Sequence, residues 1–215
     1  LLARLDTDKQ LRKWLTGFSE EKITENKSQR IEDDIKSLGK ELFKERFQLF
    51  FPEHEKTVYT RQNLEDFRIE LEKIIHWFEN YLTSSAQKAI GAIEGNGFSI
   101  NDFLHKKSGV AGYFKKLSEK RIEPPGIRTL QAAEDEQKWF LQKHHQKENL
   151  NELVVNTLQP ALKKIIVFYN DNAHQYYSAR AVKKQLRMLG ILTDLKEEIR
   201  RLLHEKGVLQ LSDSN

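Results

Sequence analysis

The sequence of 215 residues contains no cysteine, so it can form neither a disulfide framework nor a site that depends on thiol chemistry. No apolar run approaches the roughly 18–20 residues that a membrane span needs. No secretory signal is visible at the start, which reads Leu1-Leu2 without a methionine, although a truncated N-terminus would hide one. We therefore expect a cytoplasmic protein without a membrane partner.

The motifs of common catalytic centres are missing as well. Neither G-x-x-x-x-G-K-[ST] nor G-x-G-x-x-G is present to hold nucleotide phosphates, and Gly109–Gly112 is too short for either loop. No H-E-x-x-H occurs. His144 and His145 are adjacent, and two neighbours on a helix point about 100° apart. Acidic runs such as Glu134–Glu136 are typical of solvated faces. We predict no catalytic residue, metal ligand or cofactor site in this chain.

Apolar residues recur at helical spacing over most of the chain, and no strand-like alternation extends over more than a few residues before position 208. Helices are predicted to begin at Thr7, Ser28 and about Thr60. The third is expected to end at the glycines of Gly95–Gly97. Its apolar face comprises Leu64, Phe67, Leu71, Ile74, Ile75, Phe78 and Leu82.

The middle of the chain predicts shorter pieces. Ser99 and Asp102 have the spacing of a capped start, leading into a short helix around Phe103-Leu104. Further short pieces are expected over 127–147, and long helices return from Asn149, with a separate last helix after 189–194. The predicted class is all-α, with long helices around an irregular middle section of short ones.

Charge is distributed unevenly along the chain. Residues 1–100 hold 16 Lys and Arg against 18 Asp and Glu, a net charge of −2. Residues 101–215 hold 20 against 14, a net charge of +6. An anionic partner is therefore expected to bind the second part.

One candidate segment, residues 103–118, has the sequence FLHKKSGVAGYFKKLS and contains no acid. Lysines beside a flexible glycine turn could contact phosphates, and an aromatic ring could stack on a base or sugar. The alternative is a loop that buries its aromatic side chains and leaves its lysines in water. The candidate DNA contacts are Lys106, Lys107, Tyr113, Lys115 and Lys116.

A second candidate lies between Asp171 and Asp194, where no acid occurs. Its cations follow helical spacing and form one stripe, which Tyr177 extends by one turn. The adjoining face, Ala179, Val182, Leu186 and Leu189, is expected to bury. The alternative is a stripe that pairs with acids elsewhere in the fold. The basic residues of the stripe are Arg180, Lys183, Lys184 and Arg187.

Five stretches together resemble one known region. They are LLARLDTDKQLRKWLTGFSEEKI near the start, LGKELFKERF at 38–47, GFSINDFLHKKSGVAGYFKKL at 97–117, RIEPPGIRTLQA at 121–132 and LGILTDLKEEIRRLLHEKGVLQLSDSN at 189–215. That region is the helical 1B insertion subdomain of the first motor domain in UvrD/RecB-type superfamily 1 DNA helicases. The similarity is to exonuclease V beta-subunit-like members from Bacteroidetes, and it spans essentially the whole chain.

The resemblance implies an insert, residues 1–207, that lies between parts of a motor domain. Residues 208–215 would then be the first residues of a strand that returns to the motor and leads to a D-E-x-Q motif. The ATP- and magnesium-binding motifs of such a helicase would lie outside this chain. In relatives the subdomain contacts the backbone of duplex DNA ahead of the fork. The family supplies no motif for individual contacts, so the residues named above rest on charge and spacing.

These observations predict a DNA-engaging subdomain of an ATP-dependent helicase or helicase–nuclease that acts in double-strand-break repair and recombination. It would grip duplex DNA through phosphates and contact the rest of the motor. The alternative is a helical protein-interaction domain whose basic face binds an acidic partner.

Overall fold

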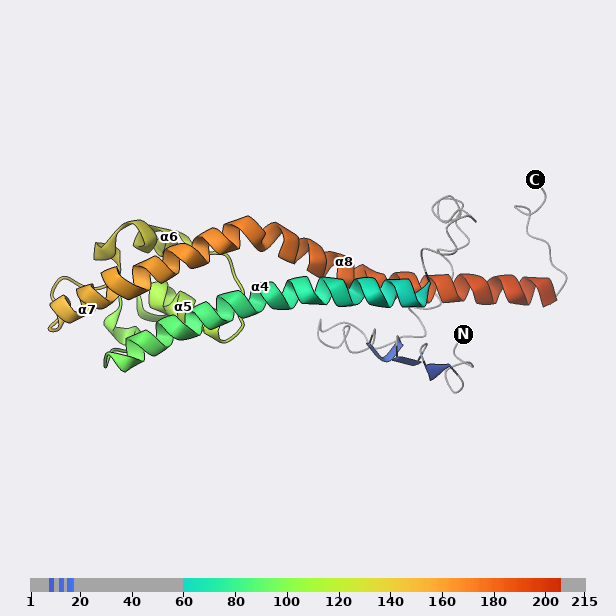
Figure 1. The fold of residues 1–215 in the computed structure, drawn as a ribbon, viewed down its shortest axis with the longest axis horizontal. Helices are drawn as coiled ribbons and strands as arrows, with labels where there is room; N and C mark the ends of the chain where they lie inside the picture. Colours follow the sequence, from blue (N-terminus) through green and yellow to red (C-terminus); the bar gives the residue numbers. More distant parts are fainter. Residues whose placement is uncertain (1–7, 10–11, 14, 18–59, 206–215) are drawn as a thin grey trace. The chain divides into compact units, whose positions relative to one another are not determined.

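The computed structural model describes residues 8–9, 12–13, 15–17 and 60–205. These residues form helices and no strand, so the predicted all-α class is confirmed for them. The helix predicted from Ser28 and the predicted return segment, 208–215, lie outside the described residues. The α-helices are α4 (Arg61–Gly95), α5 (Val110–Ser118), α6 (Ile127–Glu134), α7 (Lys147–Leu153) and α8 (Gln159–Glu205) (Figure 1).

Shorter turns connect these helices, as the irregular middle section predicted. Three are single 3₁₀ turns and the fourth is a π-helical turn directly before α8. They are η3 (Ile100–Asp102), η4 (Lys106–Ser108), η5 (Glu136–Lys138) and the π-helical η6 (Val154–Leu158). In the described part of the chain, no helix combines the length and the hydropathy that crossing a membrane requires.

The chain divides into two compact units. One comprises Leu1–Leu71 together with Ala181–Asn215, and the other is Glu72–Arg180. The boundaries fall within α4 and α8, so each of these helices contributes to both units. Helices α5, α6 and α7 and the turns between α4 and α8 belong to Glu72–Arg180.

Helix α4 begins and ends where the sequence predicts. The hydroxyl of Thr60 accepts a hydrogen bond of 3.2 Å from the Asn63 N–H and so caps the helix. At the other end Gly97 has a φ of +77°, which glycine adopts at little cost. The N–H of Phe98 then donates to the Ile93 carbonyl at 3.0 Å, which closes the helix.

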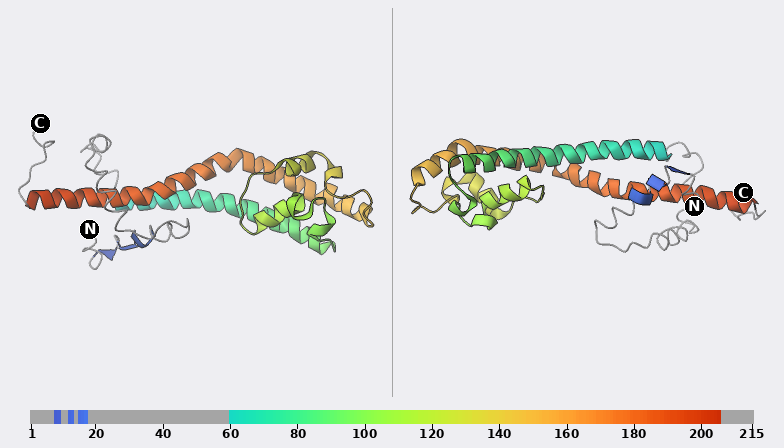
Figure 2. Two further views of the ribbon diagram at one scale, coloured as in Figure 1. Left: turned by 180° about the vertical axis from the view of Figure 1, so that it is seen from behind. Right: turned by 90° about the horizontal axis from the view of Figure 1, so that it is seen from below.

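Within Glu72–Arg180, α4 and α8 lie side by side and form the core together (Figures 1 and 2). The ring of Phe78 stacks on that of Tyr176 with centroids 4.4 Å apart. Burial and the neighbouring carboxylate of Glu79, which accepts from the Tyr176 hydroxyl at 2.9 Å, raise the pKa of Tyr176 to about 12. The buried side chains of this core include Phe78, Leu82, Ile93, Leu162, Ile165 and Tyr176.

Most of the apolar face predicted for α4 is buried, but Phe67 is exposed and Ile74 is half-buried. Leu64, Leu71 and Ile75 are buried, whereas Phe67 is 48% exposed, so its predicted burial is wrong. Residues three and four apart share a broad stripe on a helix, and a side chain at its edge meets water.

The capped start at Ser99 is confirmed, but the helix that follows is shorter than predicted. Asp102 accepts a hydrogen bond of 2.7 Å from the Ser99 N–H, and the Ser99 hydroxyl accepts from Asn101 at 3.3 Å. The turn then ends, because Phe103 is extended, and the Leu104 N–H donates to the Trp139 carbonyl at 2.6 Å. The predicted helix around Phe103-Leu104 is therefore wrong: this backbone bonds to a distant segment instead.

Helix α8 follows α7 and η6 without a break and continues through Pro160 and Gly190. A wider π turn relieves the clash that a proline ring has with the carbonyl four residues before it in an α-helix. The separate last helix predicted after 189–194 is wrong. A single glycine costs a helix only about 1 kcal/mol, and Leu186 and Ile191 on either side of Gly190 are buried.

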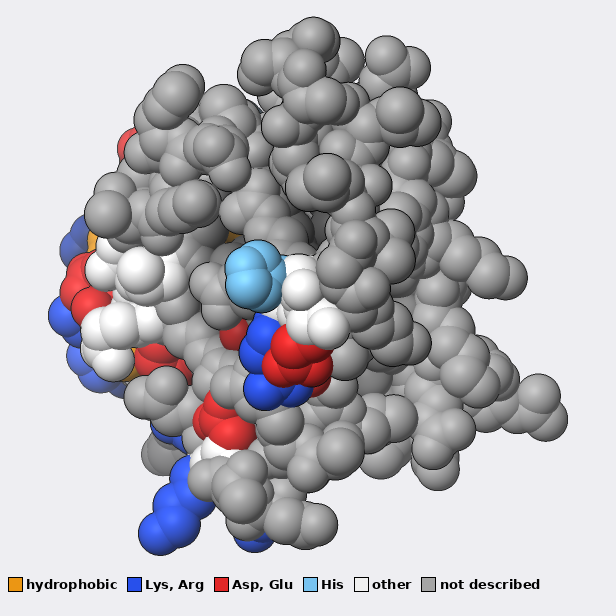
Figure 3. All heavy atoms as spheres, turned by 90° about the vertical axis from the view of Figure 1, so that its right-hand side faces the viewer, with side chains coloured by type: hydrophobic (Ala, Val, Ile, Leu, Met, Phe, Trp, Pro, Cys, Tyr) orange, Lys and Arg blue, Asp and Glu red, His pale blue; other side chains and the backbone are white. Residues whose placement is uncertain are grey.

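The C-terminal part of α8 is charged. Arg201 pairs with Glu198 at 2.7 Å, one turn before it. The described side chains visible in Figure 3 are mainly charged, with Lys or Arg beside Asp or Glu. Adjacent opposite charges of this kind stabilise an exposed helix by a few tenths of a kcal/mol per pair.

Candidate functional site

The glycines of segment 103–118 lie where two pieces of backbone pack closely, whereas the sequence suggested a flexible turn. A Cβ on Gly112 would lie 2.0 Å from the Lys107 carbonyl oxygen, and one on Gly109 would lie 2.1 Å from the Leu104 carbonyl oxygen. Only glycine, which has no Cβ, allows a backbone carbonyl to approach the helix this closely. These contacts fix η4 against the first turn of α5.

The four lysines of this segment differ in their surroundings. Lys106 and Lys107 on η4 are exposed, and neither has an ion pair within the described ranges. On α5, Lys115 lies 3.4 Å from Glu119 and Lys116 lies 2.6 Å from Glu123. The two lysines of η4 are therefore more available to an anion than the two of α5.

Tyr113 does not offer its ring to solvent. The side chain is 4% exposed, and its hydroxyl donates to the Glu123 backbone carbonyl at 3.4 Å. Burial, with the Glu123 charge as a smaller cause, raises the pKa of the phenol. A ring buried in this way has no free face for a base, so we do not retain Tyr113 as a nucleic-acid contact.

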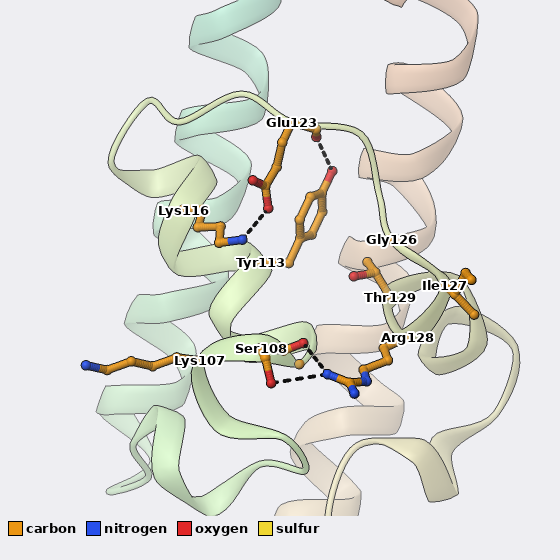
Figure 4. A pocket seen from close by; sticks show the side chains of 10 residues that line it. Lys107, Ser108, Tyr113, Lys116, Glu123, Gly126, Ile127, Arg128 and Thr129 are labelled. Carbon is orange, nitrogen blue, oxygen red and sulfur yellow. Dashed lines mark hydrogen bonds and ion pairs between the residues drawn. The ribbon is translucent and has the colours of Figure 1, made fainter.

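A cavity of about 290 Å³ opens between η4, α5 and the start of α6. Figure 4 shows Lys116 and Arg128 beside it, whereas the side chain of Lys107 extends away from it. The guanidinium of Arg128 donates to the Ser108 carbonyl at 3.4 Å and to its hydroxyl at 3.2 Å. This cavity will be called the α6 pocket; its other lining residues are Ser108, Gly109, Tyr113, Glu123, Gly126, Ile127 and Thr129.

Sequence reasoning missed Glu123, Arg128 and Thr129. All three lie beyond the acid-free segment, and Arg128 is 20 residues from Ser108. The one local signal was the Pro-Pro-Gly before Ile127, since glycine at the start of a helix leaves its first amides without a side-chain cap.

Residues 177 and 180 of the second candidate belong to the unit Glu72–Arg180. Arg180 is exposed, and its guanidinium lies 5.5 Å from the centre of the Tyr176 ring and 3.3 Å from the hydroxyl of that residue. Tyr177 is 42% exposed, with its hydroxyl 3.0 Å from that of Tyr169.

The rest of the predicted stripe belongs to the other unit. Lys184 is exposed and Lys183 is half-buried, while the side chain of Arg187 is outside the described set. On the adjoining face Ala179 and Leu186 are buried as predicted. Val182 is 40% exposed, so its predicted burial is wrong.

The two adjacent histidines lie in a turn and not on a helix, so the predicted divergence of their side chains is wrong. The rings of His144 and His145 stack with centroids 4.6 Å apart. His144 Nε2 lies 3.4 Å from an oxygen of Asp102. Among the described residues, no group of three or more His, Cys, Asp or Glu is placed to hold a metal ion.

Comparison of the chain with protein-family models, with curated proteins and with solved structures finds no match.

Proposed function

We propose that this chain is a DNA-engaging helical subdomain that grips duplex DNA through phosphate contacts. The observation that carries the proposal is the composition and exposure of residues 106–128, called here the basic segment. It holds seven Lys and Arg against two Glu, and every one of the seven is exposed or half-exposed. Such an excess supports binding to a polyanion.

The packing of the basic segment adds support. Helix α5 contacts both η4 and α6, so Lys107 and Arg128, which are 21 residues apart in sequence, lie in one part of the surface. Glu119 and Glu123 pair with Lys115, Lys116 and Arg121. In the described part of the chain this leaves four cations of the basic segment without an ion pair: Lys106, Lys107, Lys120 and Arg128.

The proposal extends to the parent protein of which this chain would be a part. The resemblance of the five stretches above supports an insert in an ATP-dependent helicase or helicase–nuclease of double-strand-break repair, with ATP and magnesium bound elsewhere in the parent protein. Residues 208–215 would return to the motor domain. Phosphate contacts carry no sequence information, which suits an enzyme that moves along any duplex.

The test is binding to random-sequence duplex over a range of salt concentrations. Changing Lys106, Lys107, Lys115 and Lys116 together to Gln should weaken binding about tenfold or more at low salt, because several phosphate contacts are lost. The slope of log K against log salt should decrease by roughly one unit for each contact removed.

A matched control removes the same charge elsewhere: Lys88, Lys143, Lys147 and Lys163, all exposed, are changed to Gln. It should alter affinity and slope much less. Equal effects of the two variants would mean that net charge alone drives binding. Failure of the wild type to bind duplex, together with capture of an acidic protein, would favour the protein-interaction alternative.

A further inference from the structure

The α6 pocket has the charge that suits an anion. Three of its lining side chains are cationic, Lys107, Lys116 and Arg128, and one is a carboxylate, Glu123. Glu123 and Lys116 are paired at 2.6 Å and largely neutralise each other. Arg128, whose guanidinium borders the pocket, therefore determines the sign of the potential inside, while the side chain of Lys107 extends away from it (Figure 4).

The first turn of α6 strengthens this preference. The residue before the helix is Gly126, which has no side chain to cap it, so the N–H groups of Ile127, Arg128 and Thr129 lack an intrahelical acceptor. Residues 126–129 all line the pocket. The end of a helix that exposes free amides attracts negative charge.

An independent observation comes from Thr129. Its side chain is 4% exposed, yet its hydroxyl makes no hydrogen bond within the described part of the chain. Figure 4 shows the oxygen of Thr129 directed into the pocket, while the Ile127 side chain points away. The hydroxyl oxygen itself reaches the pocket: among the described residues, Thr83 and not Thr129 has a fully buried side-chain oxygen without a partner. A ligand oxygen can therefore bond to the Thr129 hydroxyl in place of water.

Ser108 holds the guanidinium of Arg128 beside the pocket. Two hydrogen bonds to Ser108, at 3.4 and 3.2 Å, use one terminal nitrogen of its guanidinium. The remaining N–H groups have no acceptor among the described residues. A planar guanidinium positioned in this way matches two oxygens of a phosphate.

We propose that the α6 pocket binds one phosphate group through the guanidinium of Arg128, the hydroxyl of Thr129 and the first amides of α6. A free phosphate ion and a phosphate of the DNA backbone have the same recognising chemistry. That the group belongs to DNA rests on the proposed function above, whereas binding of phosphate itself does not.

The first experiment titrates the full chain with inorganic phosphate and follows saturable binding by calorimetry. Thr129→Val keeps the shape but removes the hydroxyl, and it should weaken phosphate binding about tenfold. Arg128→Gln should weaken it at least as much. Glu123→Gln should strengthen binding severalfold, because it removes the one carboxylate of the lining. Lys143→Gln, an exposed change elsewhere, should have no effect.

Thermal melting of each variant shows whether the fold is kept. If Thr129→Val unfolds the chain, the affinity of Glu123→Gln for phosphate still tests the proposal. Unsaturable phosphate binding, or equal affinities for wild type, Thr129→Val and Glu123→Gln, would overturn the site.

A second arm measures random-sequence duplex binding by the same variants. If the variants lose affinity for inorganic phosphate and for duplex in parallel, the pocket binds a phosphate of the DNA backbone. Loss of phosphate binding with full duplex binding supports a free phosphate as the ligand and leaves the proposed function standing. Phosphate binding by a wild type that binds no duplex supports the pocket and contradicts the proposed function.

Discussion

Gly109 and Gly112 determine how η4 meets α5. At both positions a carbonyl oxygen occupies the space that a Cβ would need. The same residues suggested flexibility in the sequence, because glycine occurs both in mobile turns and where backbones approach closely. The two cases differ only in what lies beside the glycine, and the sequence does not contain that information.

Gly112→Ala should therefore destabilise the chain by about 2 kcal/mol or more, because the Lys107 backbone has to move. Gly91 on α4 is the control, since nothing lies within 4 Å of a Cβ there. Gly91→Ala should stabilise by about 0.5–1 kcal/mol through helix propensity. Urea denaturation measures both. Two changes of the same sign would contradict this account.

Among the helical elements, those with local signals were predicted best. The start of α4 at Thr60, its end at the glycines and the capped start at Ser99 are all encoded in neighbouring residues. The continuous α8 and the extended Phe103 were missed, because burial of Leu186 and Ile191 and the bond to the Trp139 carbonyl depend on the tertiary structure.

The Asp102 carboxylate that caps η3 should make the stability of the chain depend on pH. The hydrogen bond from the Ser99 backbone is the main cause that holds the pKa of Asp102 below its usual value of 3.8. A lowered pKa means that the stabilisation is present above about pH 4 and is lost as the pH falls below it. Asp102→Asn should cost about 1 kcal/mol at pH 7, and the cost should decrease as the pH falls from 4 through the lowered pKa of Asp102.

The measurement is the free energy of unfolding at several pH values, with Asp171→Asn on the exposed side of α8 as the control. A cost for Asp102→Asn that stays constant from pH 7 to pH 3 would show that the carboxylate charge does not matter.

Across the whole molecule, positive charge occurs in both compact units. The excess of cations after residue 100 was visible in the sequence, and so was the stripe on α8. The pairing of Lys116 with Glu123, and the meeting of Ser108 with Arg128, were not visible, because they depend on how η4, α5 and α6 pack. The sequence therefore predicted a basic surface but not the pocket within it.

The stripe on α8 gives a prediction at this scale. Changing Arg180, Lys183, Lys184 and Arg187 together to Gln should weaken duplex binding well over tenfold at low salt, if these cations contact phosphates. The melting temperature should change little, because Ala179 and Leu186 carry the buried face. Titration of labelled duplex and thermal melting are the two measurements. Unchanged affinity in a folded variant would assign the stripe to ordinary solvated surface.

The π turn Val154–Leu158 indicates a place where one residue can be deleted from the chain. A π turn accommodates about one residue more than the α turn that it replaces. Val155, Asn156 and Thr157 are exposed, whereas Val154 and Leu158 on either side are buried. Deleting one of the three exposed residues would leave Val154 and Leu158 three positions apart, which is still one face of an α-helix. With Pro160 replaced by Ala, this stretch should therefore tolerate a single-residue deletion, whereas a deletion within α8 would shift the register of the residues that follow.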